Sequence, residues 1–199
     1  MPVLAYITVA VAAYLIGSIP TGFLVAKARG IDIQKAGSGN IGATNAMRVL
    51  GKPAGIFVLI MDCAKGYFAI WFCNVILKAP QESHYIVAGI FAVLGHNYTC
   101  WLKFKGGKGI ATSAGVYLAL APWAVLAALV VFILAVLVTR YVSVGSITAA
   151  IALTATVWIM TPQNLFLCIV TTALGALAIY KHKSNIQRLM AGTENRLGK

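Results

Sequence analysis

Long apolar stretches separated by short polar segments dominate this sequence. A helix needs roughly 17–25 mostly apolar residues to cross the hydrocarbon core of a bilayer. Seven stretches come close to that length, at about 3–26, 54–77, 85–102, 109–121, 123–139, 144–160 and 165–180. The stretch at 109–121 is too short to cross alone, so we expect it to use its flanks or to lie against protein. The pattern predicts an all-α, polytopic integral membrane helical bundle of about seven transmembrane helices.

Composition excludes the soluble and disordered classes. Hydrophobic residues make up 60% of the 199 residues and charged residues 10%, and the mean hydropathy is +0.87. Soluble domains are about 45–50% apolar and about 25% charged, and disordered chains are less hydrophobic still. With no internal repeat and no low-complexity linker, we expect residues 1–199 to form a single membrane domain.

The charges predict how the chain is oriented. Sixteen Lys and Arg face four acidic residues, for a formal net charge of +12. Fourteen of the basic residues lie in one set of alternate connections, at 27–52, 103–108, 140 and 181–199, whereas the opposite set holds only Lys78. Because basic residues concentrate on the cytoplasmic side, we expect the N-terminus outside and the C-terminus in the cytoplasm. No basic residue precedes Lys27, so the first stretch is expected to be an uncleaved span. This distribution also points to a membrane and not to nucleic acid as the partner.

The connection between the first two spans is rich in small polar residues. It reads GSGNIGATN from Gly37 to Asn45 and is followed by Arg48. Backbone N–H groups in tight turns of this kind form concave anion sites. Its composition equally suits a flexible polar loop.

The next basic connection contains Lys105-Gly106-Gly107-Lys108, preceded by His96. Glycines let the backbone approach an anion closely, and lysines bind phosphate as point charges. We favour phosphate binding over a simple basic membrane anchor. Leu102 stands where a nucleotide-binding P-loop requires glycine, so the segment is not an NTPase signature.

Polar residues also gather in the last two basic connections and inside the second span. Ser143, His182, Asn185 and Glu194 lie at the same predicted membrane face. Asp62 and Lys65 are three residues apart, hence on one helix face. Charges at membrane depth are costly and usually paired, and we favour a structural pair that links helices over a proton or ion path. The four cysteines show no metal-binding spacing, so we expect no metal and no cofactor.

Four motifs occur in one order: SGNIGATN with Arg48; GH followed by FKGGKGIAT; YVS; and HKSNI with the late Glu194. Together they resemble the bacterial membrane acyl-phosphate:glycerol-3-phosphate acyltransferases, the PlsY family, over nearly the whole chain. Thr99-Cys100-Trp101 departs from the Pro-Val-Phe common in that family, while the FKGGKG core is intact.

The resemblance implies transfer of a fatty acyl group from acyl phosphate to the 1-hydroxyl of glycerol 3-phosphate, the first step of phospholipid synthesis, in the bacterial inner membrane with a cytoplasmic active site. Both substrates carry phosphate, and the lipid chain enters from the membrane. The expected catalytic residues are Ser38, Arg48, His96, His182 and Asn185. The expected phosphate ligands are Asn40, Thr44, Lys105, Gly106, Gly107, Lys108 and Ser143, supported by Glu194, Asp62 and Lys65.

Two other classes of protein fit parts of the sequence. A small transporter or channel for a phosphate-bearing solute would explain the many spans and the Asp62–Lys65 pair, but it predicts polar residues through several spans. A scaffolding membrane protein would carry ordinary loops in place of glycine-basic turns.

Overall fold

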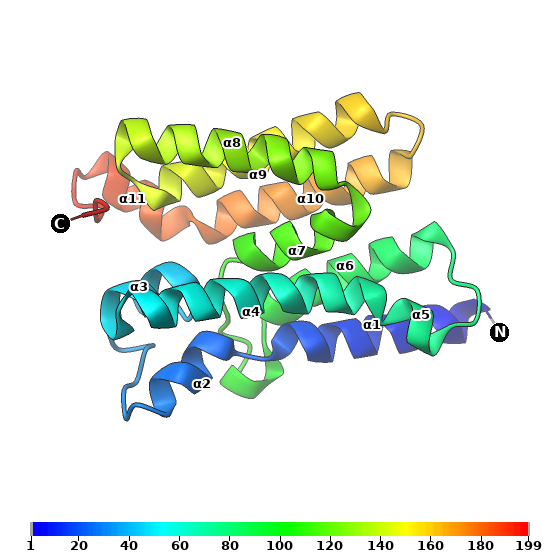
Figure 1. Ribbon diagram of the computed structural model, residues 1–199, viewed down its shortest axis with the longest axis horizontal. Coiled ribbons are helices and arrows are strands. Elements are labelled where there is room, and N and C mark those ends of the chain that lie inside the picture. The colour runs from blue at the N-terminus through cyan, green and yellow to red at the C-terminus, as the bar shows by residue number, and fades with distance from the viewer. Residues whose placement is uncertain (1, 199) are drawn as a thin grey trace. The chain divides into compact units, whose positions relative to one another are not determined.

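The computed structural model describes residues 2–198, in which every regular element is a helix (Figure 1). The chain divides into two compact units, Met1–Leu120 and Ala121–Lys199, and each is considered by itself. The predicted all-α membrane fold is confirmed.

Unit 1 is built on three long helices, α1, α4 and α6. α1 packs on α6, and α4 packs on both α3 and α7. In chain order the elements are α1 Pro2–Ser18, α2 Thr21–Lys27, α3 Ala43–Leu50, α4 Lys52–Trp71, α5 Cys73–Ile76, α6 Glu82–Asn97, the 3-10 turn Cys100–Leu102 and α7 Ile110–Leu120. Small residues allow the close contacts: a Cβ at Gly66 would collide with the Thr112 carbonyl, and one at Gly115 with the Cys63 carbonyl.

The first predicted span is broken at Pro20, between α1 and α2. Proline has no N–H group, so the helix ladder cannot continue through it. Two side chains bind the carbonyl groups that the break exposes. Thr99 Oγ1 donates to the Ser18 carbonyl at 2.6 Å, and Lys65 Nζ donates to the Ile19 carbonyl at 3.0 Å.

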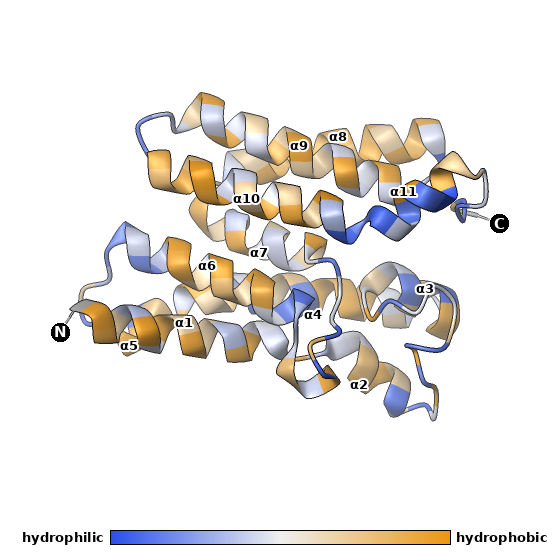
Figure 2. Cartoon of the chain, turned by 180° about the vertical axis from the view of Figure 1, so that it is seen from behind, coloured by the Kyte–Doolittle hydropathy of each residue, from blue (hydrophilic) through white to orange (hydrophobic). Residues whose placement is uncertain are grey.

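Unit 2 contains α8 Pro122–Thr139, α9 Val142–Met160, α10 Leu165–Lys181 and α11 Lys183–Met190. α9 packs against both α8 and α10. Short turns join these helices, and Arg140 ends α8 in the left-handed region at φ 65°. Figure 2 shows α8–α10 as largely apolar and α11 as mostly hydrophilic. α11 bends away from α10 by 51°.

Each of the seven predicted apolar stretches contains a helix. Within residues 2–198, five helical segments are long and apolar enough to cross a membrane, and α10 with α11 counts as a sixth if the bent pair is one span. α7 has 11 residues and is shorter than a full crossing. The chain is therefore a multi-pass membrane protein, and its total of seven crossings stays a prediction.

Candidate functional site

Asn45 organises the glycine-rich loop of unit 1. Its side chain is 2% exposed, and its Oδ1 accepts the Ser38 N–H at 2.8 Å. Its Nδ2 donates to the carbonyl groups of Ala36 at 3.0 Å and Asn40 at 2.9 Å. Asn40 Oδ1 in turn accepts the Gly42 N–H at 2.8 Å, just before α3 begins. The loop is thus a hydrogen-bonded structure around one buried amide and not a flexible connection.

Ser38 stands at the exposed tip of this loop between two glycines in left-handed conformations, Gly37 at φ 59° and Gly39 at φ 72°. Side chains rarely adopt that conformation, and a Cβ at Gly37 would also collide with Asn45 Oδ1. Thr44 and Arg48 are both exposed on α3, four residues apart and hence on one face.

The second element, the glycine-lysine turn (residues 105–108), is fastened to the end of α6. The Gly106 N–H donates to the Asn97 carbonyl at 3.2 Å, and the Gly107 N–H donates to the His96 carbonyl at 3.0 Å. These are carbonyl groups of the last helical turn, which have no partner within the helix. Lys105 is exposed and Lys108 half-buried, so the turn presents two ammonium groups on a fixed backbone.

Unit 1 brings the two phosphate-site candidates next to each other. Gln34 Nε2, three residues before the glycine-rich loop, donates to the Lys105 carbonyl at 3.5 Å. Leu102, just before the turn, packs on the apolar cluster beneath the loop, which contains Ile33, Ile41 and Val58. These two contacts join the segment around the glycine-rich loop to the glycine-lysine turn.

Asp62 and Lys65 form an ion pair inside α4, with 2.8 Å between Oδ1 and Nζ and with both side chains buried. Lys65 Nζ also lies 2.8 Å from His96 Nδ1 and binds the Ile19 carbonyl. The pair therefore links α4 to the end of α6 and to the break after α1. His96 itself is 4% exposed, with its ring against Gly107.

In unit 2, three side chains converge on the carboxylate of Glu194. Ser143 Oγ donates to Oε1 at 2.9 Å, Asn185 Nδ2 donates to Oε1 at 2.6 Å, and Arg188 Nε donates to Oε2 at 2.6 Å. Burial, the largest single influence, raises the Glu194 pKa. The three hydrogen bonds and the charge of Arg188 together outweigh it, so the pKa lies below its usual value.

His182 caps the junction between α10 and α11, and its tautomer follows from its partner. Nδ1 lies 2.7 Å from the Ala178 carbonyl. A carbonyl oxygen can only accept, so Nδ1 carries a proton, and in the neutral ring Nε2 is unprotonated. An imidazole held in this way can accept a hydrogen bond or a proton through Nε2.

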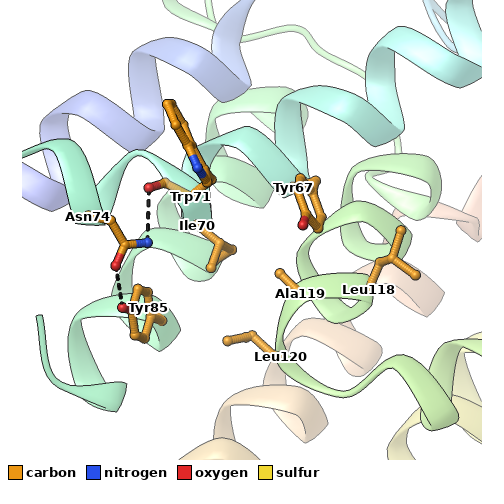
Figure 3. A pocket seen from close by; sticks show the side chains of 8 residues that line it. All are labelled: Tyr67, Ile70, Trp71, Asn74, Tyr85, Leu118, Ala119 and Leu120. Carbon is orange, nitrogen blue, oxygen red and sulfur yellow. Dashed lines mark hydrogen bonds between the residues drawn. The ribbon is translucent and has the colours of Figure 1, made fainter.

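A separate cavity of about 300 Å³ opens in unit 1 between the ends of α4 and α7 and the start of α6 (Figure 3). Its walls include Tyr67, Trp71 and Leu118, and Tyr85 Oη donates to Asn74 Oδ1 at 2.7 Å. It lies beside the last residues of α7, whereas the glycine-lysine turn precedes the first. None of the predicted site residues lines it.

The sequence analysis did not single out Asn45 or Asn97. Asn97 is fully buried, and a Cβ at Gly109 would lie 2.7 Å from its Oδ1. Both asparagines stand beside glycine-rich segments, and asparagine side chains commonly form hydrogen bonds with the backbone of such loops. This position beside glycines was the sequence signal that could have identified them. The structure also directs the Ser143 hydroxyl to Glu194, so the expected role of Ser143 as a phosphate ligand stays a prediction.

Comparison with known proteins identifies the family. A profile described as glycerol-3-phosphate acyltransferase matches residues 7–192. The chain belongs to the glycerol-3-phosphate acyltransferase family. Members from Geotalea daltonii and Geobacter sulfurreducens are 48% and 47% identical to it. The first alignment covers 95% of this chain and 96% of the relative, and the second covers 92% and 93%.

Solved structures agree with this assignment. The crystal structure of PlsY, an integral membrane glycerol 3-phosphate acyltransferase, in its glycerol 3-phosphate form has a TM-score of 0.90 at 37% identity, over 97% of this chain and 96% of that chain. Its lysophosphatidic acid form has a TM-score of 0.87 at 37% identity, over 97% and 95%. The predicted family and enzyme class are confirmed: this protein is a membrane acyltransferase.

Proposed function

We propose that this enzyme transfers a fatty acyl group from acyl phosphate to the 1-hydroxyl of glycerol 3-phosphate, giving 1-acylglycerol 3-phosphate and inorganic phosphate. The observation that carries the proposal is the contact between Gln34, just before the glycine-rich loop that contains Ser38, and the Lys105 carbonyl of the glycine-lysine turn. Two phosphate-bearing substrates require this combination of cations, hydroxyl and backbone N–H groups.

The chemistry needs no covalent enzyme intermediate. The substrate hydroxyl oxygen attacks the acyl carbonyl carbon, and the bond from that carbon to the phosphate oxygen breaks. Phosphate leaves with the bonding electrons and takes up the hydroxyl proton on one of its oxygens. The enzyme contributes orientation and stabilises negative charge on the carbonyl oxygen and the leaving phosphate.

Within unit 1, the phosphate groups are neutralised by Lys105, Lys108 and Arg48. The Ser38 hydroxyl donates a hydrogen bond to a phosphate oxygen. Asn40 and Thr44 lie in the same loop and helix start and complete this set. A guanidinium can hold two phosphate oxygens at once, which an ammonium cannot do.

Within unit 2, the Glu194 cluster fixes Asn185 and Ser143, and the Ala178 carbonyl fixes the His182 ring. These contacts hold His182 and Asn185, the residues of unit 2 that are expected to be catalytic, in fixed orientations.

Because the basic connections lie on one predicted side, we expect the active site on the cytoplasmic face of the bacterial inner membrane and the N-terminus outside. Tags at the two ends test this orientation. We expect a C-terminal tag to be reached only from the cytoplasm and an N-terminal tag only from outside. Both tags on one face would refute an odd number of crossings.

Purified protein incubated with acyl phosphate and glycerol 3-phosphate tests the reaction. We expect lysophosphatidic acid and phosphate in equal amounts, and none with acyl coenzyme A as the donor. Failure to form the product in a folded, detergent-stable sample would refute the proposed function, and export of phosphate solutes from vesicles would favour a transporter.

A further inference from the structure

The buried ion pair in α4 has a third member, His96, whose chemical state follows from the geometry. Lys65 Nζ lies 2.8 Å from Asp62 Oδ1, 2.8 Å from His96 Nδ1 and 3.0 Å from the Ile19 carbonyl oxygen. An ammonium group has three N–H donors and no lone pair. His96 Nδ1 must therefore be the acceptor, which makes the ring neutral with its proton on Nε2.

His96 also contacts the glycine-lysine turn from two directions. Its main-chain carbonyl accepts the Gly107 N–H at 3.0 Å. Its ring lies against the Cα of the same glycine, since a Cβ there would collide with Nε2. The side chain of any other residue at 107 would displace either the ring or the turn.

The turn itself has a conformation that needs support. Lys103 and Phe104, which lead into it, adopt left-handed conformations at φ 52° and φ 61°. This conformation is unfavourable for residues other than glycine, because the Cβ comes close to the backbone carbonyl oxygen. The turn is therefore held in place by its surroundings, and the His96 carbonyl and ring are among the groups that hold it.

We propose that Asp62, Lys65 and His96 form a positioning network for the phosphate-binding turn. Asp62 holds the Lys65 side chain by an ion pair, Lys65 fixes the tautomer and rotation of the His96 ring, and the ring sets the position of Gly107 between the two lysines. The inference rests on the proposed function of the turn. His96 then has a positioning role and makes no contact with substrate. The inference also explains why a buried ion pair is present at a place where well-packed apolar residues are often equally stable.

The tautomer can be observed without measuring activity. In protein carrying 15N-labelled histidine, the spectrum of His96→Asn identifies the His96 signals by their absence. We expect Nδ1 of His96 to be unprotonated and Nε2 protonated, the opposite of His182. A protonated Nδ1 on His96 would overturn the proposal.

Hydrogen exchange tests the hold on the turn. In His96→Asn, and in the double variant Asp62→Leu/Lys65→Met, we expect exchange in residues 103–109 to accelerate about tenfold, the effect of weakening one hydrogen bond. The double variant leaves no unpaired charge in the span, so it remains informative if the single variant does not fold. Unchanged exchange in both variants would overturn the proposal.

Kinetics separate positioning from a merely structural role. A displacement of binding groups by about 1 Å can cost up to roughly 100-fold in activity, and we expect the KM for glycerol 3-phosphate to rise about tenfold or more in both variants. His84→Asn is the matched control, because His84 is a second buried histidine of α6 that caps its other end. A lowered melting temperature with an unchanged KM would show a structural pair only and refute positioning.

These measurements distinguish the two proposals. An inactive but folded wild-type protein would refute the acyltransfer reaction. The nitrogen spectrum and the exchange of the turn would still decide whether the network exists.

Discussion

Replacing Glu194 by glutamine tests what holds the C-terminal segment of unit 2 in place. The carboxylate is 7% exposed and accepts hydrogen bonds from Ser143, Asn185 and Arg188. Glutamine keeps one acceptor oxygen for the first two but turns an N–H group toward Arg188. The loss of this one charge-assisted contact should lower the free energy of unfolding by about 1.5–3 kcal/mol.

The pH dependence gives a second, independent measure of the same contact. The Glu194 pKa is lower in the folded than in the unfolded protein. The carboxylate therefore stabilises the fold above its unfolded pKa of about 4.3, and this stabilisation is lost as the pH falls through the lower, folded value. Thermal unfolding in detergent should show wild type and Glu194→Gln far apart at pH 7 and converging in acid.

Asp32→Asn is the matched control. It removes a carboxylate whose ion pair with Lys35 is exposed and spans 3.6 Å. Such pairs contribute about 0–1 kcal/mol, so its melting temperature should stay close to that of wild type. Equal melting temperatures for Glu194→Gln and wild type at pH 7 would refute the reasoning.

Four further substitutions probe unit 1. In steady-state kinetics, Lys105→Ala and Lys108→Ala should each raise the KM for phosphate substrates by roughly 10- to 150-fold, the equivalent of one charge-assisted contact. Lys35→Ala, which removes an exposed lysine outside the proposed site, should leave the KM unchanged. Arg48→Lys keeps the charge but cannot form the bidentate hydrogen bond of a guanidinium to phosphate. We expect kcat/KM to fall about tenfold or more while the melting curve stays unchanged. Asn45→Leu removes the hydrogen-bond partner of the Ser38 N–H and of three carbonyl groups, so it should destabilise the protein by about 1–3 kcal/mol in thermal unfolding.

Hydropathy was sufficient to place the long apolar helices, but it did not predict α3 and α11, which lie in segments expected to be connections, or the break in the first span. The stretch at 3–26 was expected to be one helix, although Pro20 divides it into α1 and α2. The break is stabilised by Lys65 and Thr99, which are distant in sequence. No local pattern predicts a carbonyl group that binds a lysine of another helix, because the contact exists only after the helices pack.

The candidate site shows the same division. Glycine and lysine spacing identified the turn at 105–108 from the sequence alone. From charge alone, either Arg188 or Arg196 could pair with Glu194. In the fold Arg188 makes this contact, whereas Arg196 Nε donates to Tyr141 Oη at 3.0 Å. Residue types therefore indicated which chemistry is present, and the packing decided which groups meet.

Asn45 and Glu194 solve the same physical problem in the two units. A loop that binds phosphate must be polar, so it has few apolar side chains to fix its shape. Each loop is instead closed around one buried polar side chain, an amide in unit 1 and a carboxylate in unit 2, which bonds to three or more surrounding groups. Ordering the loop before substrate arrives removes that entropy cost from binding, and donors fixed in advance stabilise developing charge without reorganising. Under the proposed function, we therefore expect the buried Asn45 and Glu194 to be as necessary for activity as Lys105 and Lys108.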